Sequence, residues 1–106
     1  MYDTNLQKAD INFATSGDHE VIAAPANGYI VIDHINFLPN SNVTVQLKQG
    51  TTNYGGAYFL GNQAFTLENA MNNYKGVITL LPGEAFVINT DAAVQVSGFV
   101  RYRVIV

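Results

Sequence analysis

The sequence predicts an all-β protein, a single antiparallel sandwich or barrel of about eight to nine strands. Its 106 residues can enclose one modest core but not two. Apolar and polar residues alternate along the final segment, 94–106, which is the period of a strand with one face on a core. Turn-forming residues recur about every 8 to 12 positions, as they do in sandwiches and barrels.

The strands can be placed in order along the chain. Residues 1–9 show no apolar periodicity, and we expect them to form a flexible N-terminal arm or a short edge segment before a sandwich domain at 10–106. Strands are predicted at 10–13, 20–23, 29–38, 43–48, 57–60, 64–67, 76–81, 84–89 and 94–106. A Gly-rich polar loop is expected at 50–56, and residues 68–75 are the one irregular or weakly helical piece.

The long strand at 29–38 is apolar on both faces. Under strict alternation its apolar residues fall into two sets, Ile30, Ile32 and Leu38 on one side and Tyr29, Val31, Ile35 and Phe37 on the other. One side of each sheet in a two-layer sandwich should meet water. We therefore expect the outer face of this strand to be covered by a folded-over loop or by another chain. The second set is our predicted subunit interface.

The composition points to association and argues against several partners. Charged residues make up 12% of the chain, about half of the roughly 25% that is usual. Such a surface has either drifted to neutrality or is largely covered by partner subunits. The net charge is −3 and the five Lys and Arg residues are scattered, so we expect no nucleic-acid partner. The first ten residues lack the apolar core of a signal peptide, and no apolar run approaches the ~20 residues of a membrane span.

No set of residues predicts catalysis or metal binding, so we expect no enzyme, no cofactor and no metal. The chain lacks cysteine. His34 lies mid-strand, and its neighbour Asp33 should face the other way, so the two cannot share a local site. His19 lies between Asp18 and Glu20 at a turn, which is either a cation site or a solvated turn. No nucleophile-elbow motif surrounds the serines, and the loop at 50–56 lacks a phosphate-binding lysine.

Aromatic and basic side chains are the remaining candidates for contact with a partner. Tyr54, Tyr58 and Tyr74 lie in or beside the central loops, where they could stack on sugars or anchor a protein. Tyr58 and the adjacent Phe59 could instead roof the core. Arg101 and Arg103 share one face of the last strand. They should pair with Glu84 or Asp91, or contact another subunit.

Four short motifs, in order, resemble those of the small β-sandwich proteins that decorate or cement the capsids of tailed bacteriophages. They lie at 28–31, 43–52, 81–88 and 96–102, and the resemblance spans about residues 10–106. It implies a jelly-roll-like sandwich that forms a homotrimer, binds the major capsid protein and stabilises the outer surface of the capsid. Such a protein is made in the host cytoplasm and resides on the virion. We expect the arm, residues 1–9, to order on the capsid.

Two other functions stay open. The first is a receptor- or carbohydrate-binding module of a phage tail or fibre, which would use Tyr54, Tyr58 and Tyr74. Small jelly-roll modules also occur in those proteins, so the resemblance does not fix the position on the virion. The second is a small β-sandwich enzyme, for which the sequence nominates no site.

Overall fold

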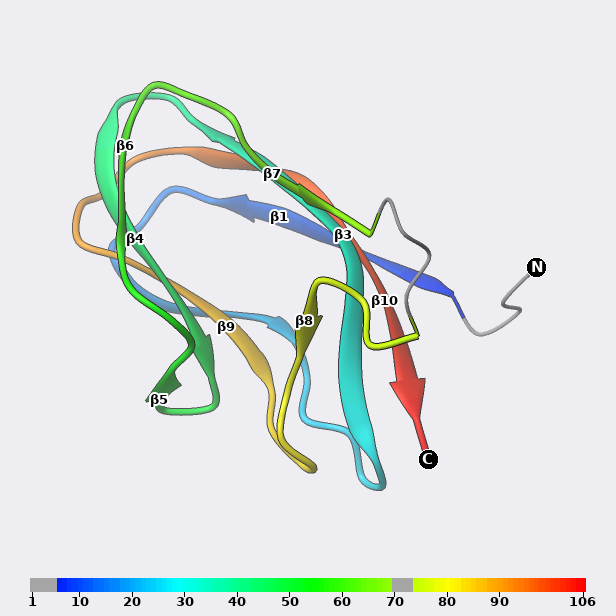
Figure 1. Cartoon of the computed structure of the whole chain (residues 1–106). Coiled ribbons are helices and arrows are strands. Elements are labelled where there is room, and N and C mark those ends of the chain that lie inside the picture. Colours follow the sequence, from blue (N-terminus) through cyan, green and yellow to red (C-terminus); the bar gives the residue numbers. More distant parts are fainter. Residues whose placement is uncertain (1–5, 70–73) are drawn as a thin grey trace.

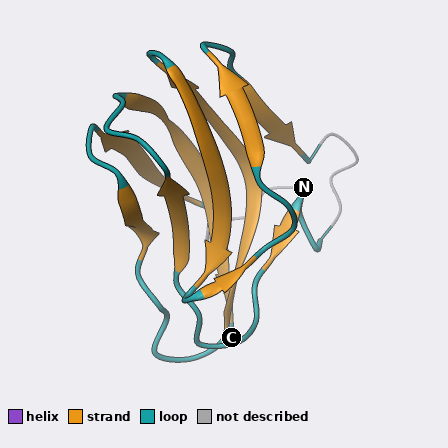
Figure 2. Cartoon of the chain, turned by 90° about the vertical axis from the view of Figure 1, so that its left-hand side faces the viewer, coloured by secondary structure: helices purple, strands orange, loops and turns teal. Residues whose placement is uncertain are grey.

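The computed structural model describes residues 6–69 and 74–106 and confirms an all-β antiparallel sandwich (Figure 1). The described residues form ten strands and no helix (Figure 2). Sheet A contains β1 (Gln7–Phe13), β10 (Val96–Ile105) and β3 (Tyr29–Pro39), with β7 (Phe65–Glu68) and β8 (Ile78–Thr79) paired to the far side of β3. Sheet B contains β2 (Gly17–Ile22), β9 (Phe86–Thr90) and β4 (Asn42–Gln49), with β5 (Thr52–Asn53) and β6 (Tyr58–Gly61) paired to the far side of β4.

The strand order is that of a jelly roll. Without the short β5 and β8, the sheets run β1-β10-β3-β7 and β2-β9-β4-β6, and the chain repeatedly crosses from one sheet to the other. The last strand lies between β1 and β3 and pairs antiparallel with both. It therefore completes sheet A, as its length and its apolar face predict.

Several boundaries differ from the prediction. Strand β2 begins at Gly17, so His19, which we expected at a turn, lies within a strand, and β8 covers only 78–79 of the predicted 76–81. Strand β1 begins at Gln7, so residues 7–9, which we expected to be part of an arm or a short edge segment, pair with 100–102 of β10 as the start of an edge strand. Gln7 and Lys8 are exposed and only Ala9 packs against the core, so these residues show no clear alternation. Residues 1–5 lie outside the described residues. Strand β5 falls inside the predicted loop, because Gly50 adopts a positive φ of 59° and lets the chain return as a tight hairpin.

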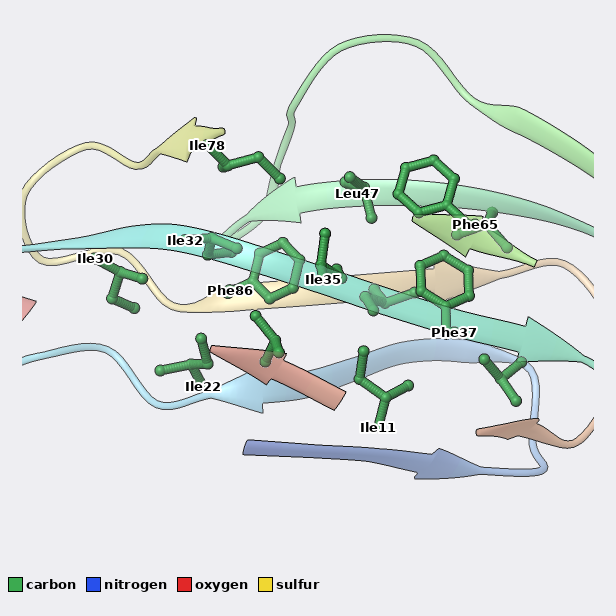
Figure 3. Close-up of a cluster of buried hydrophobic side chains, with 14 of the residues drawn as sticks. Ile11, Ile22, Ile30, Ile32, Ile35, Phe37, Leu47, Phe65, Ile78 and Phe86 are labelled. Carbon is green, nitrogen blue, oxygen red and sulfur yellow. The ribbon is translucent and has the colours of Figure 1, made fainter. Parts of the chain in front are cut away.

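The core lies between the two sheets and is built from Ile, Val, Leu and Phe of both (Figure 3). Phe37 of sheet A and Phe86 of sheet B are the largest side chains that are fully buried. A pair of rings closes each open side of the sandwich. Phe13 stacks on His19 between β1 and β2, with ring centroids 3.7 Å apart. Tyr58 meets Phe65 edge-on between β6 and β7, at 4.7 Å.

A β-bulge in β3 explains why strict alternation along the sequence assigns apolar residues to both faces of this strand. Arg101 of β10 lies opposite His34, but the next residue, Tyr102, lies opposite Ile32, which leaves Asp33 without a register partner. One extra residue reverses the direction of every side chain that follows it. Ile30 and Ile32 before the bulge therefore face the core, and so do Ile35 and Phe37 after it. They form one buried face rather than two.

The bulge corrects the predicted subunit interface. Ile35 and Phe37 are 0% and 1% exposed inside the core, so they are not available to a second chain. Val31 does face outward, opposite Arg103, yet it is only 1% exposed. A Cβ placed on Gly76 would lie 2.7 Å from Val31 Cγ1, so the segment before β8 covers this side chain. Tyr29 is half-buried at the start of the strand. Of the two expected covers, the structure shows the folded-over loop.

Candidate functional site

The residues nominated for chemistry serve structural roles. Within residues 6–69 and 74–106, no three His, Cys, Asp or Glu side chains gather closely enough to hold a metal ion. The His19 ring stacks on Phe13, and its Nε2 lies 2.7 Å from the carbonyl oxygen of Thr15. Asp18, its neighbour on β2, accepts hydrogen bonds from Lys48 and Asn89 on the other strands of sheet B. The described residues include no helix long and apolar enough to cross a bilayer.

The hydrogen bonds to the Asp18 carboxylate make the stability of the fold depend on pH. The side-chain hydrogen bond from Asn89, at 2.7 Å, and then that from Lys48, at 3.0 Å, lower the pKa of Asp18 below 3.8. A carboxyl group whose pKa is lower in the folded state stabilises the fold above its unfolded pKa. That contribution is lost as pH falls through the folded value.

We expect Asn89→Ala to reduce the pH dependence of stability in acid. The variant removes the main cause of the lowered Asp18 pKa, so its stability deficit should be present at pH 6 and shrink below pH 3.8. Because Asp18 is exposed, the effect should be ~0.5 kcal/mol. Urea unfolding at a series of pH values between 6 and 2 measures it. A deficit that is constant over this range would contradict the assignment.

The bulge residue Asp33 is the centre of a polar cluster on the outer face of sheet A. Its carboxylate accepts two hydrogen bonds from Arg103, to Oδ2 from Nε at 2.6 Å and to Oδ1 from Nη2 at 2.9 Å. Asn69 Nδ2 donates to the same Oδ1 at 3.0 Å, and Arg103 Nη2 also reaches the carbonyl oxygen of Tyr74. The cluster therefore ties Asn69, which directly follows β7, and the backbone of Tyr74 to the bulge.

Arg103 pairs with Asp33, which is not among the partners expected for the arginines of β10, namely Glu84, Asp91 or another subunit. In a regular strand Asp33 and His34 would face opposite ways, as we expected. The bulge places Asp33 on the outer face together with His34, and this brings it within reach of Arg103. Asp91 instead accepts a hydrogen bond from the backbone N–H of Thr44.

Asp33→Ala should lower the free energy of unfolding by about 2 kcal/mol, because it leaves Arg103 without its carboxylate. The side chains of Arg103 and Asp33 are 12% and 19% exposed, so this is less than the loss of a fully buried pair. Asp10→Ala is the matched control. The Asp10 side chain pairs with Lys8 but is 73% exposed, so this ion pair should contribute less than about 0.5 kcal/mol. Equal losses in the two variants, measured by urea unfolding, would contradict the structural role of the cluster.

The same outer face carries an aromatic ring surrounded by polar groups, which we call the Phe99 patch: Lys8, Asp10, His34, Asn36, Phe99 and Arg101. Phe99 is half-buried, and the His34 ring stacks on it with centroids 5.4 Å apart. Lys8 Nζ and Arg101 Cζ lie 6.0 Å and 5.6 Å from the ring centroid. This patch was not predicted, although the alternation of β10 places Phe99 on the polar face, between Ser97 and Arg101.

Strand β6 is an exposed edge of sheet B. Among the described residues it pairs only with β4, so the backbone groups on its other side face outward. Phe59 projects from the outer face and is 74% exposed. Residues 50–67, which include this strand, contain no charged residue and no proline. Edge strands are normally protected by Lys, Pro, a bulge or a covering segment. The first two are missing here.

The three tyrosines predicted to contact a ligand do not form one site. Tyr54 is half-buried against the core, and Tyr58 uses its ring to close the side of the sandwich. Tyr74 is 73% exposed, but it lies beyond β7 beside sheet A, next to Arg103. In Figure 1 the segment that begins at residue 74 and strand β6 are on opposite sides of the view.

Comparisons of this chain with protein-family models, with curated protein sequences and with solved structures found no match.

Proposed function

We propose that the chain is a structural virion protein, a homotrimer that binds the major capsid protein on the outer surface of a phage capsid and stabilises the shell. Its resemblance to capsid decoration proteins and its jelly-roll fold favour this function. The fold alone decides nothing, because lectin-like domains and cupins share it. The observation that carries the proposal is the uncharged, exposed edge at β6.

The β6 edge is suited to permanent contact between chains. Backbone groups that face outward along an edge strand can form a ladder with a strand of another molecule. Phe59 and Tyr58, 74% and 39% exposed, add apolar area that would leave water on contact. A closed trimer requires the β6 edge of each protomer to meet a different surface of the next one.

Stabilisation of a capsid requires only buried area. A trimer that spans the boundary between neighbouring capsid subunits adds contacts that must be broken before those subunits can separate. Binding to the assembled shell and not to free subunits shifts the equilibrium toward the shell by mass action. This mechanism requires no catalytic group and no cofactor.

Particles of the phage that encodes the chain provide the test. We expect peptides of the chain in purified virions, and we expect purified protein to sediment with particles from which its gene has been deleted. Phe59→Lys should prevent this binding because it destroys the trimer. Leu81→Lys, which changes a loop residue that is 59% exposed, should bind normally. Virions without the chain, or particles that do not bind the purified protein, would contradict the proposal.

The carbohydrate-binding alternative is no longer supported by Tyr54, Tyr58 and Tyr74 as a set, because Tyr54 and Tyr58 pack against the core at sheet B while Tyr74 lies beside sheet A. A different surface, the Phe99 patch, has features that favour a sugar ligand.

A further inference from the structure

We infer that the Phe99 patch binds an acidic saccharide, with Arg101 and Lys8 contacting the carboxylate and Phe99 contacting the sugar ring. The site is on the outer face of sheet A. It is separate from the β6 edge and does not depend on the trimer.

Charge is distributed unevenly between the two faces of the sandwich. The chain is acidic overall, yet four of its five Lys and Arg residues lie on the side of sheet A: Lys8, Lys75, Arg101 and Arg103. Asp10, Asp33 and Glu68 lie on the same side and offset part of this charge. On sheet B, Lys48 of β4 is outnumbered by Asp18 and Glu20 of β2, which lie across β9. An anionic ligand is therefore attracted to the outer face of sheet A rather than to the opposite face.

Two like charges face each other directly within the patch. Lys8 of β1 is the register partner of Arg101 of β10. Directly opposed like charges destabilise an antiparallel pair. Asp10 forms an ion pair with Lys8 at 3.2 Å. No carboxylate among residues 6–69 and 74–106 lies within ion-pair distance of Arg101, which is exposed. A bound carboxylate would give Arg101 an ion-pair partner, and the guanidinium fork matches its two oxygens.

The remaining groups of the patch favour a sugar over a bare anion. Phe99 lies among Lys8, His34 and Arg101, all within about 6 Å of its ring. The part of the half-buried Phe99 ring that His34 does not cover offers a surface to the C–H groups of a pyranose. Asn36, the register partner of Phe99, lies 2.9 Å from His34 Nε2, so amide and imidazole groups beside the ring can bond hydroxyls.

Amide NMR titration of the labelled full chain tests the inference. The probes are a tetrasaccharide of alternating glucuronate and N-acetylglucosamine, the neutral N-acetylglucosamine tetramer, a tetraglutamate peptide and inorganic phosphate. We expect saturable shifts around Lys8, His34, Phe99 and Arg101 with the acidic tetrasaccharide and much smaller ones with the neutral tetramer. Equal affinity for tetraglutamate would overturn the inference in favour of an acidic peptide. Binding of phosphate alone, or shifts elsewhere, would overturn it as well.

Three variants separate the roles of the side chains. Arg101→Gln should weaken binding of the acidic tetrasaccharide about tenfold or more, because a hydrogen-bonded charge pair is lost. Phe99→Leu should weaken binding of the acidic tetrasaccharide and leave any response to inorganic phosphate unchanged. Lys48→Gln, on sheet B, should bind as the parent does. Unchanged saccharide affinity in Arg101→Gln would overturn the inference. The mass of Arg101→Gln in solution should still be that of the trimer. A loss of saccharide binding in this variant is then independent of the proposed capsid function.

Discussion

Phe37→Ala is expected to lower the free energy of unfolding by about 4 kcal/mol. Phe37 is 1% exposed, and its ring stacks on Phe65 with centroids 4.9 Å apart in the core (Figure 3). Removing the ring forfeits its burial and leaves a cavity that the two sheets cannot fully close. Urea unfolding followed by circular dichroism measures the loss.

Leu38→Ala is the matched control, because this neighbour faces outward and is 48% exposed. It should change stability by less than about 0.5 kcal/mol. The pair of variants tests which face of β3 meets the core after the bulge at Asp33. In a strand without the bulge, Ile30, Ile32 and Leu38 would share one face and Phe37 would face the other way. A larger loss for Leu38→Ala than for Phe37→Ala would contradict the observed register.

Gly98→Ala is expected to cost about 3 kcal/mol, the upper end of what overpacking usually costs. Gly98 lies opposite Phe37 in the centre of sheet A. A Cβ at this position would lie 2.0 Å from the Asn36 carbonyl oxygen and 2.6 Å from Phe37 Cα. Both are backbone atoms, so β10 and β3 would have to separate where sheet A is most extensively paired.

Gly56→Ala serves as the control for the loss of a glycine. A Cβ on Gly56 meets no atom within 4 Å, and its φ is not in the left-handed region. The change should therefore alter stability by less than about 0.5 kcal/mol. Thermal unfolding of both variants provides the comparison. Gly98→Ala with the melting temperature of the parent would contradict the close approach of the two strands.

The sequence predicted elements that follow one period from end to end. Val43, Val45 and Leu47 alternate with polar residues, and all three are buried in β4. Strand β3 misled the prediction because a bulge changes the phase of the alternation without changing the composition. The signal was present as two polar residues, Asp33 and His34, side by side within an apolar run.

The candidate surfaces could be predicted only in part. The lack of charge along residues 50–67 is visible in the sequence, but the sequence does not show that β6 ends a sheet. The Phe99 patch depends on the register of β1, β10 and β3, which brings Lys8, Arg101 and His34 into one row across three strands. Residues so distant along the chain cannot be aligned before the strand order is known.

Association through the β6 edge is tested most directly by the mass of the protein in solution. Light scattering on a sizing column at micromolar concentration should give three chain masses for the parent and for Leu81→Lys. Phe59→Lys should give one chain mass, because a lysine on an edge strand opposes pairing with another chain. A parent that is monomeric at every concentration, or a trimer that Phe59→Lys leaves intact, would contradict association through this edge.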